Sequence, residues 1–394
     1  MPVYHRLGQL PPKRHSIFRQ KDGSLHPEEL VGNHGFVGPS SLLYHLHAPT
    51  RVESIRHLRD VPLVADPEPT FRHRHFKTAQ MAAAASLTLD RQPFLFNHDV
   101  SLWFARASGS DPFFYRNAAA DELVYLSDGS GVLESQMGSI PVRRGDYVVI
   151  PRGILHRFVL AGEARALIME SAGYIRTPRR YRNEFGQLLE SSPYCERDFR
   201  PPSELPVHDE KGEHKLVIKK AARLQEITLD HHPLDVVGWD GYYYPFAFNI
   251  AEFEPRVGRF HLPPPVHQTF EGDGFVVCSF CPRPFDFDAQ GVPAPYNHSN
   301  VMSDEVLYYA NSEFMSRKGI EYGSITLHPD GIPHGPHPGR TEESLGKPGT
   351  SELAVMMDTF RPLQVALPAL AIEDSAYYRS WVEDGGAHPL TGGL

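Results

Sequence analysis

A twelve-residue pattern occurs twice in this chain, and it limits the folds that the chain can adopt. Residues 145–156 and 323–334 both fit Gly-x5-Pro-x-Gly-x2-His. Each copy follows a segment that begins with Asp-Glu and continues with aliphatic residues and Tyr, at 121–126 and 304–309. Four fixed residues at fixed spacing, repeated after the same kind of strand, indicate two copies of one structural unit.

The composition predicts that these units are built from strands. The chain has 36 Pro and 32 Gly among 394 residues, and its β-branched and aromatic residues form short runs between turn signals. These features favour turn-rich β structure over long helices. The repeated pattern resembles the second conserved motif of cupins, small jelly-roll barrels whose first motif carries His residues and a Glu and whose second motif carries a His. We therefore predict a mostly β bicupin: two jelly-roll β-barrels, an N-terminal extension and few helices.

Changes in local composition predict the domain boundaries. Residues 1–90, rich in His, Arg and Pro, are expected to form an N-terminal extension. Residues 91–175 would form the first barrel and 236–368 the second. The polar, charged segment 176–235 is interpreted as a connector, and 369–394 as a C-terminal tail with one short amphipathic helix around residues 375–383.

The second unit contains a candidate metal site. His298, Glu305 and His334 supply two imidazoles and one carboxylate, the ligand set that binds non-heme Fe(II) on one face and leaves the opposite face open. Asn300 stands where a typical cupin has a second His, so three protein ligands leave room for a chelating substrate and dioxygen together. A trio of buried, hydrogen-bonded polar residues without a metal is the alternative. The first unit keeps Glu122 and His156, but residues 116–121, directly before Glu122, contain no His, which predicts a degenerate, structural barrel.

Charge and hydropathy patterns exclude several function classes. The net charge is −9 and no basic block is present, so nucleic acid is not an expected partner. No apolar stretch approaches the roughly 18 residues of a membrane span, and the N-terminus lacks a signal-type apolar region. We expect no membrane partner and a cytoplasmic location.

At the level of longer segments the chain resembles the homogentisate 1,2-dioxygenases, bicupin Fe(II) enzymes that cleave the ring of 2,5-dihydroxyphenylacetate. The resemblance covers roughly residues 195–365, and it is carried by 237–245, 258–265, 280–284, 296–303 and 328–336.

The resemblance implies roles for individual residues. Iron would be bound by His298, Glu305 and His334, with His261 as the acid/base histidine. His328 would be a histidine that hydrogen-bonds a substrate hydroxyl. Tyr296 and Asn300 would line the pocket, and Phe314 and Arg317-Lys318 stand where the family has a pocket tyrosine and a nearby lysine, so Arg317 or Lys318 could pair with a substrate carboxylate.

The carboxylate ligand can be assigned in two ways. A gapless alignment with the family would choose Asp304, because the family has one residue fewer after the first ligand histidine. We favour Glu305, since Asp-Glu-Val-Leu-Tyr is the cupin strand in which the Glu faces inward, and period-2 alternation puts Asp304 on the other face.

The predicted function is Fe(II)-dependent ring cleavage by a dioxygenase that acts on homogentisate, giving maleylacetoacetate, or on a closely related 2,5-dihydroxy aromatic acid. The expected partners are this small substrate and dioxygen, and the resemblance implies a homo-oligomer, a trimer or hexamer. Three alternatives remain open: a gentisate or other hydroquinone dioxygenase, a zinc isomerase of the cupin type, and a non-catalytic metal-binding bicupin.

Overall fold

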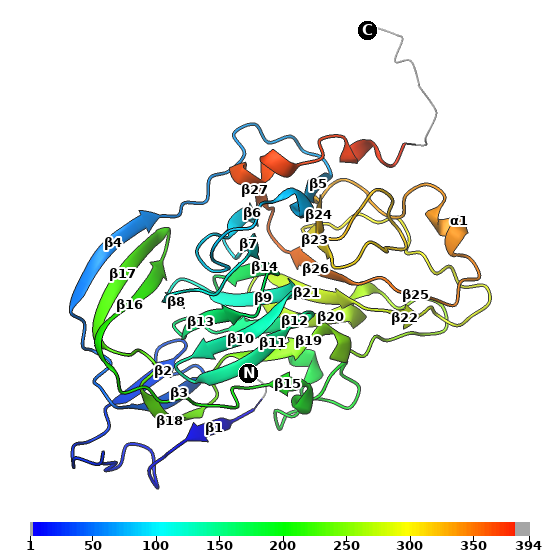
Figure 1. Cartoon of the computed structure of the whole chain (residues 1–394). Helices are drawn as coiled ribbons and strands as arrows, with labels where there is room; N and C mark the ends of the chain where they lie inside the picture. Colours follow the sequence, from blue (N-terminus) through cyan, green and yellow to red (C-terminus); the bar gives the residue numbers. More distant parts are fainter. Residues whose placement is uncertain (1–2, 383–394) are drawn as a thin grey trace.

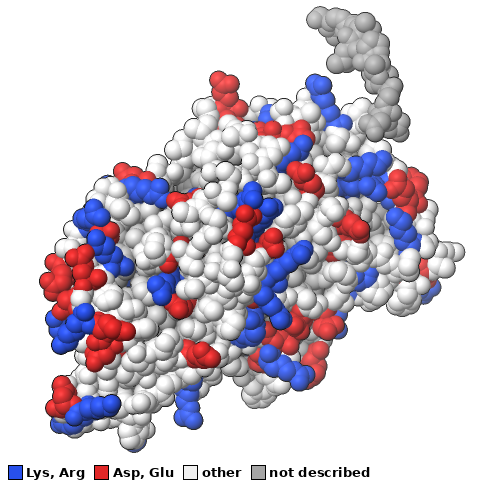
Figure 2. Space-filling model, in the orientation of Figure 1, with Lys and Arg blue, Asp and Glu red and all other residues white. Residues whose placement is uncertain are grey.

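The computed structural model describes residues 3–382, which are built almost entirely from strands joined by loops (Figure 1). Within these residues there is one short α-helix, α1 (Arg340–Ser344), and the other helical pieces are short 3-10 turns. No helix among these residues is long and apolar enough to cross a membrane. Acidic and basic side chains are interspersed over the face seen in Figure 2. The predicted mostly β class with few helices is confirmed.

The first barrel is formed by two sheets. One is eight-stranded, in the order β15 (Phe199–Arg200), β19 (Phe246–Asn249), β12 (Asp146–Ile150), β9 (Asp121–Asp128), β14 (Ala164–Ser171), β7 (Val100–Ala107), β6 (Gln92–Phe96) and β27 (Gln364–Val365). The other is seven-stranded, in the order β11 (Gly138–Arg143), β10 (Ser130–Ser135), β13 (Leu155–Leu160), β8 (Phe114–Asn117), β16 (Lys211–Lys220), β17 (Arg223–His231) and β4 (Ser54–Asp60).

The second barrel has one regular sheet opposite a layer of loops. The sheet is six-stranded, in the order β20 (Gln268–Gly272), β21 (Phe275–Phe280), β26 (Ala354–Thr359), β23 (Asp304–Tyr309), β24 (Ser324–His328) and β5 (Arg74–Lys77). The opposite layer contains a two-stranded ladder, β22 (Arg283–Pro284) with β25 (Gly349–Thr350). A smaller four-stranded sheet has the order β1 (His5–Gly8), β18 (Val236–Gly241), β3 (Ser40–His45) and β2 (Glu28–Gly32).

The 3-10 turns lie mainly where a strand leads into a loop. They are η1 (Thr78–Gln80), η2 (Arg179–Tyr181), η3 (Glu196–Asp198), η4 (Ile250–Glu252), η5 (Pro264–His267), η6 (Leu367–Ile372) and η7 (Tyr377–Arg379). The helix predicted around residues 375–383 is only the single turn η7 within the described residues, and residue 383 lies outside them.

The repeated pattern has the same local cause in both barrels. Its first glycine, Gly145 or Gly323, has φ of 87° or 84°, and its second, Gly153 or Gly331, has φ of 84° or 86°. These left-handed conformations are open to glycine without the steric cost that a Cβ brings. The pattern therefore encodes one tight turn before a strand and one after it; this strand is β12 in the first barrel and β24 in the second.

The two barrels share one hydrophobic core because their large sheets pack against each other. Tyr308 on β23 contacts Tyr125 on β9, with ring centroids 6.1 Å apart, and the hydroxyl of Tyr147 lies 2.8 Å from that of Ser279. Alternation along β23 therefore sends Val306 and Tyr308 into the interface between the barrels. Leu307, which lies between them on the strand, points into the second barrel, where it belongs to a hydrophobic cluster with Tyr309.

Strand pairing crosses the predicted domain boundaries repeatedly. The N-terminal extension supplies β4 to the first barrel and β5 to the second. The segment predicted as a connector contains the β16–β17 hairpin, and β19, from the predicted second barrel, pairs with β12 of the first. The ranges of the domains stay a prediction, but no barrel is closed by its own range of residues alone.

Candidate metal centre

The three predicted ligands come together at one end of the second barrel. Glu305 is on β23, His334 follows the turn after β24, and His298 lies in the loop before β23. The main chains of His298 and His334 form an isolated antiparallel bridge, with N–H donors 2.8 and 2.9 Å from the opposite carbonyl oxygens. This bridge places the two imidazoles side by side, with ring centroids 4.3 Å apart.

The ligand atoms are arranged for a shared cation. Nε2 of His298 is 3.7 Å from Oε2 of Glu305, and Nε2 of His334 is 3.4 Å from Oε1. One ligand atom from each of the three residues lies within 4.8 Å of the others, and residues 3–382 contain no further group of this kind. Nε2 of His334 is buried without a hydrogen-bond partner. An unpartnered imidazole nitrogen facing a carboxylate fits a divalent metal, and two His with one carboxylate is a set that suits Fe(II).

The Nδ1 atoms of His298 and His334 also indicate a metal site. Nδ1 of His298 lies 3.2 Å from the carbonyl oxygen of Tyr296, and Nδ1 of His334 lies 3.5 Å from that of Ile332. A proton on Nδ1 that points to a backbone carbonyl leaves Nε2 as the lone-pair nitrogen, the form in which histidine binds a metal.

The structure places Glu305, and not Asp304, beside the imidazoles. The Asp304 carboxylate accepts hydrogen bonds from the backbone N–H groups of Asp330 at 2.8 Å and Leu363 at 2.7 Å. Asp304 therefore lies on the face of β23 opposite Glu305, as the alternation predicts. Burial tends to raise the pKa of Glu305, but the surrounding imidazoles of His298, His328 and His334 outweigh it and hold that pKa well below its usual range.

His328 lies behind Glu305 and does not line the cavity beside the ligands. It is fully buried, and both ring nitrogens are engaged: Nδ1 lies 2.8 Å from Oε1 of Glu305 and Nε2 lies 3.2 Å from the hydroxyl of Tyr377. In this arrangement neither ring nitrogen of His328 is free to hydrogen-bond a substrate hydroxyl, because Nδ1 contacts Glu305 and Nε2 contacts Tyr377. His328 instead contacts the carboxylate of Glu305 from the side away from the cavity.

A cavity lined by both apolar and charged side chains opens in front of the ligands. Its wall includes His298, Glu305 and, from the predicted set, His261, Phe314 and Arg317. Further apolar and aromatic wall residues are Val257, Leu262, Pro264, Phe280, Phe285, Leu307 and Met356. Such a wall is suited to a planar aromatic ligand with few polar contacts.

Tyr296 and Asn300 are not brought into this wall. Tyr296 is 60% exposed and packs on the ring of His261, with centroids 5.0 Å apart. Both residues are two positions from His298, so a continuing strand would have put them on its face. His298 pairs at a single bridge only, and the alternation does not extend to its neighbours.

Arg317 is the unusual charge of the cavity. Its side chain is buried, it forms no ion pair with a carboxylate among residues 3–382, and its Nε atom has no hydrogen-bond partner. It donates to the carbonyl oxygen of Gly335 and its guanidinium lies 5.6 Å from the ring centre of Trp381. By contrast Arg283, in the same wall, is paired with Glu352 at 2.8 Å.

Three further residues near the site carry no sequence signal that we recognised. His267, at the end of η5, lies in the cavity wall with its Nδ1 buried and unpartnered, and burial, then Arg283, lowers its pKa to about 3. Nε2 of His73, just before β5, lies 3.2 Å from the carbonyl oxygen of Pro333, the residue that precedes ligand His334. Asp358 faces Glu305 across β26 and β23, and burial, then Glu305, raises its pKa to about 8. Tertiary contacts alone bring these residues to the site.

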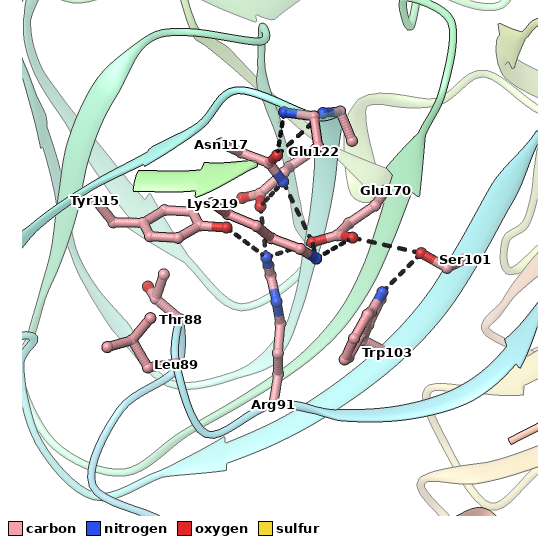
Figure 3. A network of polar contacts seen from close by, with 12 residues as sticks. Thr88, Leu89, Arg91, Ser101, Trp103, Tyr115, Asn117, Glu122, Glu170 and Lys219 are labelled. Carbon is pink, nitrogen blue, oxygen red and sulfur yellow. Dashed lines mark hydrogen bonds and ion pairs between the residues drawn. The ribbon is translucent and has the colours of Figure 1, made fainter. Parts of the chain in front are cut away.

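The first barrel contains an arginine at the corresponding place. Nη2 of Arg91 lies 2.7 Å from Oε1 of Glu122, the residue that the repeat matches to Glu305, and it also donates to Glu170 and to the hydroxyl of Tyr115 (Figure 3). His156, matched to His334, stays 3.9 Å from Glu122.

A second cation completes this network. Nζ of Lys219 lies 2.7 and 2.6 Å from the two oxygens of Glu170, and Asn117 donates to Glu122 at 2.8 Å (Figure 3). Burial tends to raise the pKa of Glu122, but the Arg91 guanidinium lowers it well below its usual range. Two buried carboxylates thus face two protein cations, which leaves no uncompensated negative charge for a divalent ion.

The fold and the site together define a bicupin whose second barrel carries a candidate two-histidine, one-carboxylate metal centre. Comparison with known proteins gives the family. The model of the homogentisate 1,2-dioxygenase N-terminal family matches residues 78–250. The protein named "Putative dioxygenase SSO1533" of Saccharolobus solfataricus is 43% identical over 384 residues, which are 97% of this chain and 99% of that protein. The chain belongs to the homogentisate 1,2-dioxygenase family.

Solved structures similar to this chain include two that span most of its length. A cupin 2 conserved barrel domain protein from Leptotrichia buccalis covers 76% of this chain and 99% of its own, with a TM-score of 0.34 and 10% identity. The protein Ylba from E. coli covers 77% of this chain and 93% of its own, with a TM-score of 0.31 and 7% identity.

Proposed function

We propose that this protein is an Fe(II)-dependent ring-cleaving dioxygenase whose substrate is homogentisate or a closely related 2,5-dihydroxy aromatic acid. Membership of the family supports the reaction class, and the ligand set supports iron. One observation carries the substrate class: a buried guanidinium without a carboxylate partner, that of Arg317, lines the same cavity as His298, Glu305 and several aromatic rings.

The unpaired charge of Arg317 argues for an anionic ligand. A buried cation without a paired carboxylate is costly, and a substrate carboxylate would supply both the opposite charge and an acceptor for the unpartnered Nε atom. Lys318 is a weaker candidate for this role, because its Nζ reaches the carbonyl oxygen of Pro338 at 2.8 Å and the residue is absent from the cavity wall.

The cavity residues would then act in three ways. The rings of Phe280, Phe285 and Phe314 exclude water and pack on the aromatic ring of the substrate. His261, on the exposed side of the cavity, takes the proton of a ring hydroxyl, which suits an imidazole in contact with solvent. When bound, ferrous iron supplies the electron transfer to dioxygen that the protein side chains cannot perform.

Oxygen uptake tests the proposal. The protein is reconstituted anaerobically with Fe(II), and air-saturated buffer with homogentisate, gentisate or unsubstituted hydroquinone is added. We expect uptake with homogentisate and slower uptake with hydroquinone, which lacks the carboxylate, and no uptake by the His334→Ala variant. No uptake with any of the three by metal-loaded protein would refute the proposal, and faster turnover of gentisate would move the substrate to the shorter acid.

A further inference from the structure

A histidine and a tyrosine form a chain of contacts behind the metal centre. The imidazole of His328 lies between the carboxylate of Glu305, 2.8 Å from Nδ1, and the hydroxyl of Tyr377, 3.2 Å from Nε2. His328 is 0% and Tyr377 is 5% exposed, so water has little access to these polar atoms. The order of the three residues is therefore fixed by protein contacts alone.

The direction of the hydrogen bonds follows from the ligand. An ionised carboxylate can only accept, so Nδ1 of His328 carries the proton that is donated to Glu305. A neutral imidazole then has its lone pair at Nε2, and that atom accepts from the Tyr377 hydroxyl. As a donor to Nε2, the Tyr377 hydroxyl thus stabilises the tautomer of His328 whose Nδ1–H donates to Oε1 of Glu305.

The segment that contains Tyr377 is hydrogen-bonded to β5 and to the residue after ligand His334. The N–H of Asp374 donates to the carbonyl oxygen of His75 on β5 at 2.8 Å. Nε1 of Trp381 donates to the carbonyl oxygen of Gly335, the residue after ligand His334, at 3.1 Å. Tyr377 lies between these two anchors, which keeps its hydroxyl in register with His328.

We propose that Tyr377 is a positioning residue of the metal centre: through His328 it orients the carboxylate of Glu305 and thereby raises the affinity for a divalent cation. The proposal rests on the metal site of the proposed function. Residues that orient a metal ligand through its outer atoms typically change metal affinity 10- to 100-fold when they are replaced.

The test measures binding of Mn(II) and Co(II) to the metal-free full chain by calorimetric titration. Tyr377→Phe removes only the hydroxyl, and Tyr378→Phe makes the same change at the next residue, which is 43% exposed. We expect Tyr377→Phe to bind about 10- to 100-fold more weakly and Tyr378→Phe to bind like the wild type. The unfolding temperature of the metal-free variants, measured in parallel, separates loss of orientation from loss of folding.

A double variant tests the route through His328. In a His328→Gln background, which alone should weaken binding by a similar factor, Tyr377→Phe should add little, because the residue it acts on is gone. Equal affinity of Tyr377→Phe and wild type, or a full additional loss in the double variant, would overturn the proposal while leaving the metal site intact. If wild-type protein binds neither ion, this proposal and the proposed function both fail.

Discussion

The guanidinium of Arg91 and the carboxylate of Glu122 lie 2.7 Å apart inside the first barrel, where the second barrel has Glu305 beside two imidazoles. Both barrels thus hold a buried carboxylate at the matched position of the repeat. In one barrel a protein side chain compensates its charge, and in the other the unpartnered nitrogen of His334 faces it.

Replacing Arg91 should destabilise the first barrel strongly. The Arg91→Met variant leaves Glu122 and Glu170 with only Lys219 as cation, and breaking a buried ion pair typically costs about 3–5 kcal/mol. Chemical denaturation of metal-free protein measures this loss. Arg106→Met, which removes a solvent-exposed pair with Glu163, should change stability little. Equal losses of unfolding free energy in the two variants would contradict the expectation that the buried ion pairs contribute more to stability than the exposed one.

The two candidate carboxylates should respond differently to removal of their charge. We expect Glu305→Gln to weaken Co(II) binding by at least about 100-fold, because a ligand is lost. Asp304→Asn should leave metal affinity nearly unchanged but lower stability by about 1–3 kcal/mol, since the side chain would accept from only one of the two backbone N–H groups. Loss of metal binding by Asp304→Asn alone would reverse the assignment.

Removal of the unpaired guanidinium should affect anionic substrates selectively. Arg317→Met is expected to lower kcat/KM for homogentisate about 10- to 100-fold, as for a lost charge-assisted hydrogen bond, and to leave turnover of hydroquinone unchanged. Lys318→Met is the matched control and should alter neither rate. An equal loss of kcat/KM with both substrates would show that Arg317 supports the site but does not bind the substrate carboxylate.

A buried histidine outside the site should make stability depend on pH. His45 is held between Asp235, at 2.7 Å, and Glu29, at 3.2 Å; burial lowers its pKa, but these two carboxylates outweigh it and raise that pKa to about 9. The pKa is higher than in the unfolded chain, so the stabilisation is complete below about pH 6.5 and is lost as the pH rises through 9.

The His45→Gln variant isolates this effect. Its free energy of unfolding should fall below that of the wild type by about 3 kcal/mol at pH 6, and by much less at pH 10. Urea denaturation of both proteins at the two pH values gives the difference. A difference that does not change with pH would mean that His45 is not charged in the folded protein.

Much of the site could be predicted because its signals are local. The turn glycines and the ligand His334 lie in one twelve-residue pattern, and alternation along a single strand separates Glu305 from Asp304. Tyr296 and Asn300, which the resemblance implied as pocket residues, do not line the cavity, because His298 pairs at one bridge only and its neighbours lie in a loop. His328, predicted to hydrogen-bond a substrate hydroxyl, instead contacts Glu305 and Tyr377, and nothing in the sequence signals the contact with Tyr377.

The sequence by itself thus determined the repeat, the strand class, the inward face of β23 and the family, since spacing and periodicity are preserved in any fold that buries one face of a strand. Only the tertiary structure decided which distant residues complete each barrel. Arg91 fills the first site, and Arg317 stays without a carboxylate. Tyr377 lies 49 positions from His328 in the chain. Such contacts follow from the packing of whole sheets, and no periodic pattern in the chain records them.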